Sequence, residues 1–287
     1  MMVKIQARMK IVTAFYDIGR GGWGAFGRST KDYIRSFMNY TRLGYDVIAF
    51  IDDRIDTSGW RGCTVVPINE RWLMEKTVSW PKIGRARAIM SSDGYRRMVG
   101  QRIDRQYPEN VHPEYNMINH CKTDFLRIAT CMVHDHDDMI AWSDFGYFHA
   151  VLHNDPSVFP TRPIDSTKLA ADRMNFFLVH PPPISVDNIL RIVVEAPEIF
   201  TGSFFAGPAR ILSGEFFHLY QECLDELHSM GTTDDDQTIY LMCYLRRPDL
   251  FVLHGMNGSW PRALYDLQVA VSDDAATTDN QQGADHQ

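Results

Sequence analysis

An aspartate and a histidine, both of a type that binds metals, stand where apolar stretches of the chain end. Asp144 follows the apolar run 139–142, and His254 follows the run 250–253. If both runs are strands of one open α/β sheet, Asp144 and His254 lie at the edge where such sheets bind ligands. Mg²⁺ and Mn²⁺ prefer carboxylate oxygens, tolerate an imidazole and bridge a protein to a diphosphate. The pattern predicts a divalent metal site at this edge.

The same two residues also fit plainer roles. Asp144 lies two residues before Gly146 and could cap a turn, and His254 could be an ordinary loop histidine. The segment His254-Gly-Met-Asn-Gly-Ser-Trp260 favours a site, because Gly255 and Gly258 let the backbone approach an anion closely. Spacing alone leaves both interpretations open.

Lysine and aspartate side chains supply further candidates. Lys122 lies one or two helical turns from Tyr115, where it could neutralise a departing diphosphate or be a surface lysine. Asp234, Asp235 and Asp236 precede an apolar helix, so at least one of them should be its N-cap. As an alternative, one of them accepts the proton of an acceptor hydroxyl or holds the acceptor in place.

The His-Asp run 134–138 is not expected to bind metal. It lies in a polar connection, and no other ligand is spaced to complete its coordination shell. The five cysteines contain no CxxC pair, which argues against a structural zinc site and against a disulfide framework.

The charge balance disfavours nucleic acid as a partner. The chain has 29 basic and 36 acidic residues and a formal net charge of −7. One exception is the arginine-rich segment 82–105, which is either a solvated helix face or a docking face for an anionic lipid or a phosphorylated acceptor. No stretch has the roughly 20 apolar residues that a membrane span needs. We therefore expect a cytoplasmic protein, at the inner face of the membrane if that segment docks there.

The elements that would position these residues alternate along the chain. Apolar patterns predict strands at 10–16, 47–53, 64–67, 139–147, 175–180, 191–194 and 250–253, and helices at 29–44, 113–131, 210–230 and 234–245. Strand, helix and strand in sequence indicate a parallel unit with a right-handed crossover. We predict a single α/β domain over residues 1–270, with a mixed sheet flanked by helices. Residues 271–287 have a polar composition that predicts a disordered tail.

Four stretches occur in the order found in a known family. They are Val12-Thr-Ala-Phe-Tyr-Asp-Ile-Gly-Arg-Gly21 with Ser29 and Tyr33, His112-Pro-Glu-Tyr-Asn116 with Lys122, Trp142-Ser-Asp-Phe-Gly146, and Asp235-Asp-Gln237. In these stretches, which extend over about residues 10–260, the chain resembles the HtrL/YibB group of bacterial glycosyltransferases. The resemblance implies a GT-A fold with a Rossmann-like nucleotide-binding half, a divalent metal and a nucleotide-diphosphate sugar as donor.

Residues and resemblance together lead to a hypothesis about the roles of the candidates. The nucleotide would be contacted by Thr13, Ala14, Tyr16 and Arg20, its base or ribose by Asp52, and the phosphate region by Ser143, Gly255 and Gly258. Asp144 and His254 would hold Mn²⁺ or Mg²⁺ on the diphosphate, and Lys122 would offset the charge of the leaving group. Asp235 or Asp236 would act on the acceptor, as a base in inverting members or as a positioning group in retaining ones.

Two departures from related patterns bear on the metal. GT-A members usually carry Asp-x-Asp, whereas this chain has Ser143-Asp144-Phe145, with one carboxylate. The segment from His254 to Trp260 is similar to His-x-x-Gly-x-x-Lys-Pro-Trp of glycogenin-like transferases, where the histidine binds manganese, but Lys-Pro is missing here. The full ligand set therefore stays open.

Two other functions fit the same groups. One is a nucleotidyltransferase or nucleotide-sugar hydrolase, and the other is a non-catalytic sugar-binding relative. The acceptor would be a glycan or a lipid-linked molecule. The sequence does not select the donor sugar, the base, the stereochemical outcome or the oligomeric state.

Overall fold

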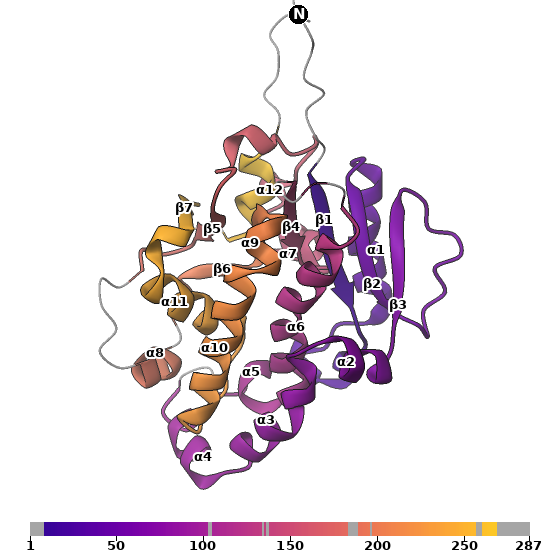
Figure 1. The fold of residues 1–287 in the computed structure, drawn as a ribbon. Helices are drawn as coiled ribbons and strands as arrows, with labels where there is room; N and C mark the ends of the chain where they lie inside the picture. The colour runs from indigo at the N-terminus through magenta and orange to yellow at the C-terminus, as the bar shows by residue number, and fades with distance from the viewer. Residues whose placement is uncertain are drawn as a thin grey trace, which may run out of the picture.

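A seven-stranded sheet forms the centre of the molecule. The computed structural model describes residues 9–102, 105–133, 135, 138–182, 189–195, 197–256 and 260–268. Across the sheet the strand order is β3-β2-β1-β4-β6-β5-β7 (Figure 1). The strands are β1 (Lys10–Phe15), β2 (Asp46–Asp52), β3 (Cys63–Ile68), β4 (Met139–Ser143), β5 (Met174–Leu178), β6 (Phe200–Pro208) and β7 (Phe251–Gly255).

Six of the seven strands run in the same direction. β3, β2, β1 and β4 are parallel neighbours, whereas β6 runs antiparallel to both β4 and β5, and β7 is parallel to β5. The carboxyl ends of all strands except β6 therefore lie at one edge of the sheet. This confirms the predicted mixed α/β sheet, with a parallel half that continues into a mixed half.

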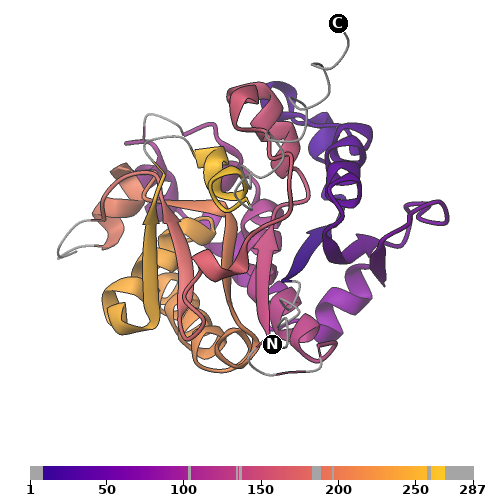
Figure 2. The same ribbon diagram turned by 90° about the horizontal axis from the view of Figure 1, so that it is seen from above.

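Helices cover both faces of the sheet and bury a hydrophobic cluster on each (Figures 1 and 2). One face carries α1 (Thr30–Arg42), α7 (Tyr147–Asn154) and α12 (Ala263–Asp266), and the other carries α6 (Pro113–Thr130), α9 (Ala209–Ser213), α10 (Glu215–Ser229) and α11 (Asp236–Arg246). Shorter helices surround these layers, namely α2 (Glu70–Lys76), α3 (Ile83–Met90), α4 (Asp93–Val99), α5 (Pro108–Val111) and α8 (Ile189–Glu195).

Local sequence signals explain how the first helix begins and ends. The Ser29 side chain accepts a hydrogen bond from the backbone N–H of Asp32, which caps α1. Gly44 follows the helix with a positive φ of 72°, a conformation that glycine adopts without steric cost. Between these ends, Phe37 and Tyr40 are fully buried against the sheet. The helix predicted at 29–44 is thereby confirmed.

Two predicted elements differ in the structure. The strand predicted at 191–194 is wrong, because these residues belong to helix α8. Short apolar runs fit a strand or a buried helix equally well. The helix predicted at 210–230 is divided at Gly214, whose backbone (φ −109°, ψ −103°) is not helical, into α9 and α10.

Among the helices of the described ranges, none combines the length and the apolar character that crossing a bilayer requires. Residues 269–287 lie outside the described ranges, so the predicted domain boundary and tail stay predictions.

Candidate functional site

A cavity of about 320 Å³ lies at the carboxyl ends of β1 and β4. We call it the β1–β4 cavity. Its walls are the end of β1, the glycine-rich loop (residues 17–28), helix α6 and the turn after β4. They include Ala14, Tyr16, Arg20, Arg28, Tyr33, Tyr115, Lys122, Asp144 and Gly146. Adjacent parallel strands form such openings at their carboxyl ends. The fold therefore gathers four of the residues predicted from sequence, namely Ala14, Tyr16, Arg20 and Lys122, around Asp144.

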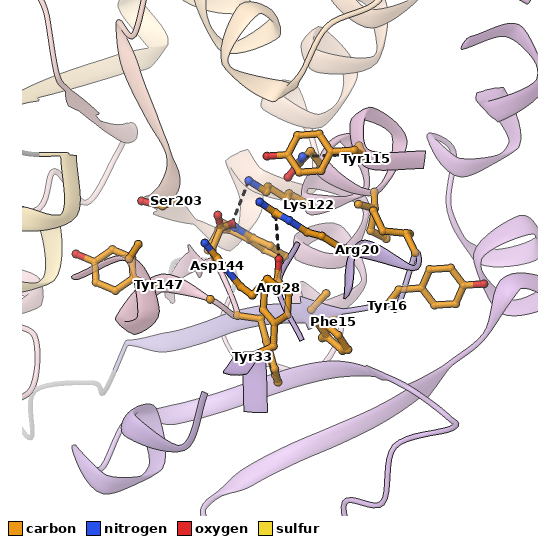
Figure 3. A pocket seen from close by; sticks show the side chains of 18 of the residues that line it. Phe15, Tyr16, Arg20, Arg28, Tyr33, Tyr115, Lys122, Asp144, Tyr147 and Ser203 are labelled. Carbon is orange, nitrogen blue, oxygen red and sulfur yellow. Dashed lines mark hydrogen bonds and ion pairs between the residues drawn. The ribbon is translucent and has the colours of Figure 1, made fainter. Parts of the chain in front are cut away.

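Lys122 lines this cavity next to Asp144 (Figure 3) and also pairs with Asp236. Its Nζ lies 3.0 Å from Asp144 Oδ1 and 2.8 Å from Asp236 Oδ2, and it donates a hydrogen bond of 2.9 Å to the Gly202 carbonyl. The Lys122 side chain is only 5% exposed. Burial opposes its charge, but Asp144 and Asp236 outweigh burial and raise the pKa of Lys122. Lys122 is therefore a buried, permanently charged ammonium group.

Asp144 presents its carboxylate to the cavity from a fixed turn. Its Oδ1 also accepts a hydrogen bond of 2.7 Å from Trp142 Nε1. The turn is held by the Tyr40 hydroxyl, which donates to the Asp144 carbonyl, and by the Asp144 N–H, which donates to the Ser203 carbonyl. Because the Asp144 side chain is still 37% exposed, it can meet a ligand.

The aspartates before α11 have different roles. Asp235 is the N-cap of the helix and accepts from the Gln237 N–H at 3.0 Å, which confirms the expectation that one of the three caps it. The Asp236 side chain is 3% exposed and paired with Lys122. It packs so closely on Gly202 that a Cβ there would lie 3.1 Å from both carboxylate oxygens.

Asp235 is the aspartate that remains open to a ligand. It lines two cavities, whereas Asp234 is bonded to Arg102 and Thr238. Burial, followed by the negative charges of Asp236 and Asp234, raises the pKa of Asp235 well above its usual range. A carboxylate with a raised pKa is a stronger base once ionised.

Two further cavities continue from the first. The α11 cavity, of about 250 Å³, shares Tyr115, Lys122 and Asp144 with the β1–β4 cavity. The α5–α8 cavity, of about 700 Å³, shares Tyr115 and Asp235 with the α11 cavity. The three cavities thus lie next to one another in a series, which we call the cavity path, from Arg20 and Arg28 past Lys122 to Asp235.

Three basic side chains line the β1–β4 cavity against two carboxylates, so its lining has a net positive charge; they are Arg20, Arg28 and Lys122 against Asp17 and Asp144. Arg20 donates to the Tyr33 hydroxyl at 2.9 Å and to the Phe26 carbonyl at 3.1 Å, and Arg28 lies 5.2 Å from the Tyr33 ring. Neither arginine has a carboxylate partner in the described part of the chain, so both are available to an anion. Figure 3 shows Arg20 beside Lys122 and Arg28 beside Asp144. Arg28 was not predicted from the sequence, although it is the second arginine of the glycine-rich loop.

Three predicted nucleotide contacts lie behind the cavity wall instead of in it. Thr13 and Ser143 are fully buried within the sheet, where Ser143 Oγ is 2.5 Å from the Tyr40 hydroxyl. Asp52 is also buried, and its oxygens accept from the backbone N–H groups of Asp17 and Arg54 and from the Arg54 guanidinium. These hydrogen bonds lower the pKa of Asp52 although burial opposes its charge. In this arrangement Asp52 positions the loop after β1 and does not line the cavity.

The structure does not bring His254 to Asp144. His254 lies on β7, with its Nε2 2.9 Å from Asn175 Oδ1 and its ring stacked on Phe177. Strands β6 and β5 separate β7 from β4, and three strand spacings amount to roughly 14 Å. Burial lowers the pKa of His254, so its imidazole is neutral. Gly255, the last residue of β7, lines none of the three cavities.

Two motifs fall partly outside the described ranges. In the segment 254–260, Gly258 lies outside the described ranges. In the run 134–138, His134, His136 and Asp137 do. Their predicted roles stay predictions.

The fit of a divalent cation rests on Asp144. Within the described ranges, no three His, Cys, Asp or Glu side chains form a group that could hold a metal by themselves. Asp144 and Asp236 both pair with Lys122, but the Asp236 side chain is only 3% exposed, whereas that of Asp144 is 37% exposed. Mg²⁺ is often held by one or two carboxylates, with phosphates and waters as the other ligands. Asp144 could therefore be one protein ligand of a cation that arrives with a diphosphate.

Fold and site together define an α/β protein with a cationic cavity at the carboxyl edge of its sheet. The chain belongs to the HtrL/YibB family, because residues 7–267 match the family described as "Bacterial protein of unknown function (HtrL_YibB)". It is 26% identical over 265 residues to Protein HtrL of Escherichia coli (strain K12), which covers 87% of this chain and 89% of that protein. The family predicted from the sequence is confirmed.

A solved structure with a similar arrangement is the apo form of mouse xyloside xylosyltransferase 1. The TM-score is 0.42 and the sequence identity 10%, and the match covers 85% of this chain and 84% of that one.

Proposed function

We propose that this chain is a glycosyltransferase that moves a sugar from a nucleotide-diphosphate sugar to a hydroxyl group of an acceptor. The observation that carries the proposal is the bridge from Asp144 through Lys122 to Asp236. It stands where the β1–β4 cavity meets the α11 cavity. Fixed charge is thus concentrated between the β1–β4 cavity and a cavity that contains the carboxylate of Asp235.

The proposed reaction divides along this path. The diphosphate lies in the β1–β4 cavity, where Arg20 and Arg28 pair with its oxygens. The acceptor oxygen forms a bond to the anomeric carbon, and the bond from that carbon to the β-phosphate oxygen breaks. Lys122 stabilises the negative charge that develops on the leaving nucleoside diphosphate.

Asp235 acts on the acceptor in this proposal. In an inverting transfer its carboxylate takes the proton of the attacking hydroxyl, and in a retaining transfer it positions that hydroxyl. Asp236 is committed to Lys122 and positions the ammonium group. When bound at Asp144, Mn²⁺ or Mg²⁺ would supply further neutralisation of diphosphate charge.

Substitution of Asp144 tests the proposal. We expect Asp144→Asn to lose metal-dependent binding of nucleoside diphosphates in calorimetry, while the far-ultraviolet circular dichroism stays that of the wild type. Asp138→Asn, another aspartate close to β4, is the matched control and should bind normally.

The products of the wild-type protein decide between reaction types. If the chain is a glycosyltransferase, the donor should lose its sugar only when a molecule with an acceptor hydroxyl is present. Equal release of free sugar or pyrophosphate without any acceptor would overturn the proposal in favour of a hydrolase or a nucleotidyltransferase. Sugar binding that ignores both nucleotide and metal would favour a non-catalytic relative.

A further inference from the structure

One end of the molecule is basic although the chain as a whole is acidic. Residues 80–105, which contain α3 and α4, have seven basic and two acidic residues, against a net charge of −7 for the chain. Figure 1 shows α3, α4 and α5 together at the lower end of the molecule. We call the surface of residues 82–102 and 105 the basic pole.

Most arginines of the basic pole are not used in ion pairs. Lys82 pairs with Asp225, Arg87 with Glu114 and Arg102 with Asp234. The remaining four are exposed, and within the described ranges they have no carboxylate partner; they are Arg85, Arg96, Arg97 and Arg105. Internal pairing therefore does not account for this charge, and an external anion would.

An apolar groove opens beside these arginines. The α4–α8 groove, of about 860 Å³, has apolar walls from Tyr95 and Met98 of α4, Leu190 and Val194 of α8, and Met230 at the end of α10. Arg96 and Arg97 lie on the same short helix as Tyr95 and Met98 and are exposed. Met230 itself is 39% exposed. Cationic and apolar surfaces thus lie side by side.

We propose that the basic pole docks on an anionic lipid bilayer, with an acyl chain in the α4–α8 groove. Arginine side chains are attracted to the negative surface of such a membrane, and apolar side chains partition into its interface. A nucleic acid would satisfy the arginines but offers no apolar phase to fill the groove. The acidic remainder of the chain also disfavours a polyanion that surrounds the protein.

The groove leads towards the candidate site. It shares Gln101, Val194 and Glu195 with the α5–α8 cavity, which contains Asp235. An amphiphile whose chain lies in the groove would place its polar head in that cavity. The acceptor would then be a membrane-held lipid-linked molecule, an inference that rests on the proposed glycosyl transfer.

Vesicle sedimentation tests the docking without any sugar donor. We expect the wild-type chain to bind phosphatidylcholine vesicles that contain phosphatidylglycerol, and to bind pure phosphatidylcholine vesicles far less. Each arginine near an anionic surface changes partitioning about fivefold, so R96Q/R97Q should bind on the order of 30-fold more weakly. The control R42Q/R61Q removes the same charge from exposed positions outside the pole and should bind like the wild type.

A second pair of variants tests the groove. Met230→Gln should weaken vesicle binding several-fold, whereas Met132→Gln, at a residue that is equally exposed (40%), should not. Three outcomes would overturn the docking. One is that the chain shows no preference for anionic vesicles, and another is that both arginine variants lose vesicle binding equally. The third is that a soluble polyanion binds as tightly as vesicles and that Met230→Gln does not change its binding. None of these outcomes affects the proposed transfer, which is measured with soluble donor. Conversely, if the chain transfers no sugar, its binding to vesicles should still be observed.

Discussion

The two ends of the cavity path carry opposite charge. The β1–β4 cavity contains Arg20 and Arg28 without carboxylate partners in the described part of the chain. The α5–α8 cavity is lined by five carboxylates, from Glu109, Glu195, Glu198, Asp234 and Asp235, and by one arginine that pairs with Asp234. The first cavity suits a diphosphate and the second suits a neutral or cationic polyhydroxy group. Lys122 lies between them, so the charges that line the cavity path would direct the donor to one end and the acceptor to the other.

Removal of Lys122 should have the largest effect on this contrast. Lys122→Met leaves Asp144 and Asp236 facing each other without a cation, and loss of one partner from a buried pair costs about 3–5 kcal/mol. We expect this loss in chemical denaturation, together with loss of transfer. The exposed Lys76→Met is the control. If the double variant Lys122→Met/Asp236→Asn regains stability but not transfer, the role of the lysine in stability is separated from its role in catalysis. If Lys122→Met alone is as stable as the wild type, the buried bridge is refuted.

Asp235→Asn should act on activity and stability in opposite directions. As a base, Asp235 contributes roughly 10²–10⁴-fold to the rate, which the amide would remove. Asparagine also caps helices well, so α11 should persist. Because the folded pKa of Asp235 is raised above the usual 3.8, the wild-type residue costs stability as pH rises through and above that value. The variant should therefore exceed the wild type in Tm at pH 7, and this gain should vanish below the usual Asp pKa.

The pH dependence of transfer checks the same residue independently. Transfer by the wild type should fall as pH drops through the raised pKa of Asp235, because protonation removes the base. Asp172→Asn, at an exposed position, should change neither the pH profile nor the Tm. A variant Asp235→Asn that retained the wild-type rate would assign the acceptor chemistry to another group.

Arg28→Gln should affect only the donor end of the path. A hydrogen bond to a charged group contributes about 1.5–3 kcal/mol, so nucleoside diphosphate binding should weaken by about tenfold or more. The KM for the acceptor should not change, because Arg28 does not line the acidic cavities. Arg35→Gln, an exposed arginine of α1, is the control for net charge. Equal changes in donor and acceptor constants would contradict the separation of the two ends.

The sequence predicted those parts of the site that follow a strand end closely. Ala14, Tyr16 and Asp144 stand at the carboxyl ends of β1 and β4, and the alternation of apolar runs is enough to place such ends at one edge. Lys122 was found because its helix precedes β4. These inferences need only the order and type of the elements.

What the sequence did not predict depends on strand order and side-chain direction. The position of β7 beyond β6 and β5 separates His254 from Asp144, and nothing within either segment encodes that order. Thr13 and Ser143 each precede a cavity residue by one position, but both are fully buried, and Ser143 contacts Tyr40 of α1, so the tertiary packing at each strand end decides between wall and interior. The place of Arg28 next to Gly146 and the hydrogen bond from Asp17 to the buried Asp52 both depend on contacts between distant segments.

The smallest expected effect comes from one methyl group placed between the glycine-rich loop and the turn after β4. In Gly146→Ala, the new Cβ would lie 2.9 Å from Arg28 Nη1 and 3.0 Å from Tyr33 Cε1, while the backbone φ of −91° suits alanine. The fold should therefore tolerate the change, but the guanidinium must move. Diphosphate binding should weaken by roughly threefold, about 0.6 kcal/mol, which is less than in Arg28→Gln.

Gly255→Ala is the matched control for this methyl group, because an added Cβ there meets no atom within 4 Å. It should bind nucleoside diphosphates like the wild type, whereas the double variant Gly146→Ala/Arg28→Gln should bind no more weakly than Arg28→Gln alone. Such non-additivity is expected only if the methyl group acts through the guanidinium. Additive losses would mean that Gly146 contributes to the cavity by another route, and that the cationic end of the path is not centred on Arg28.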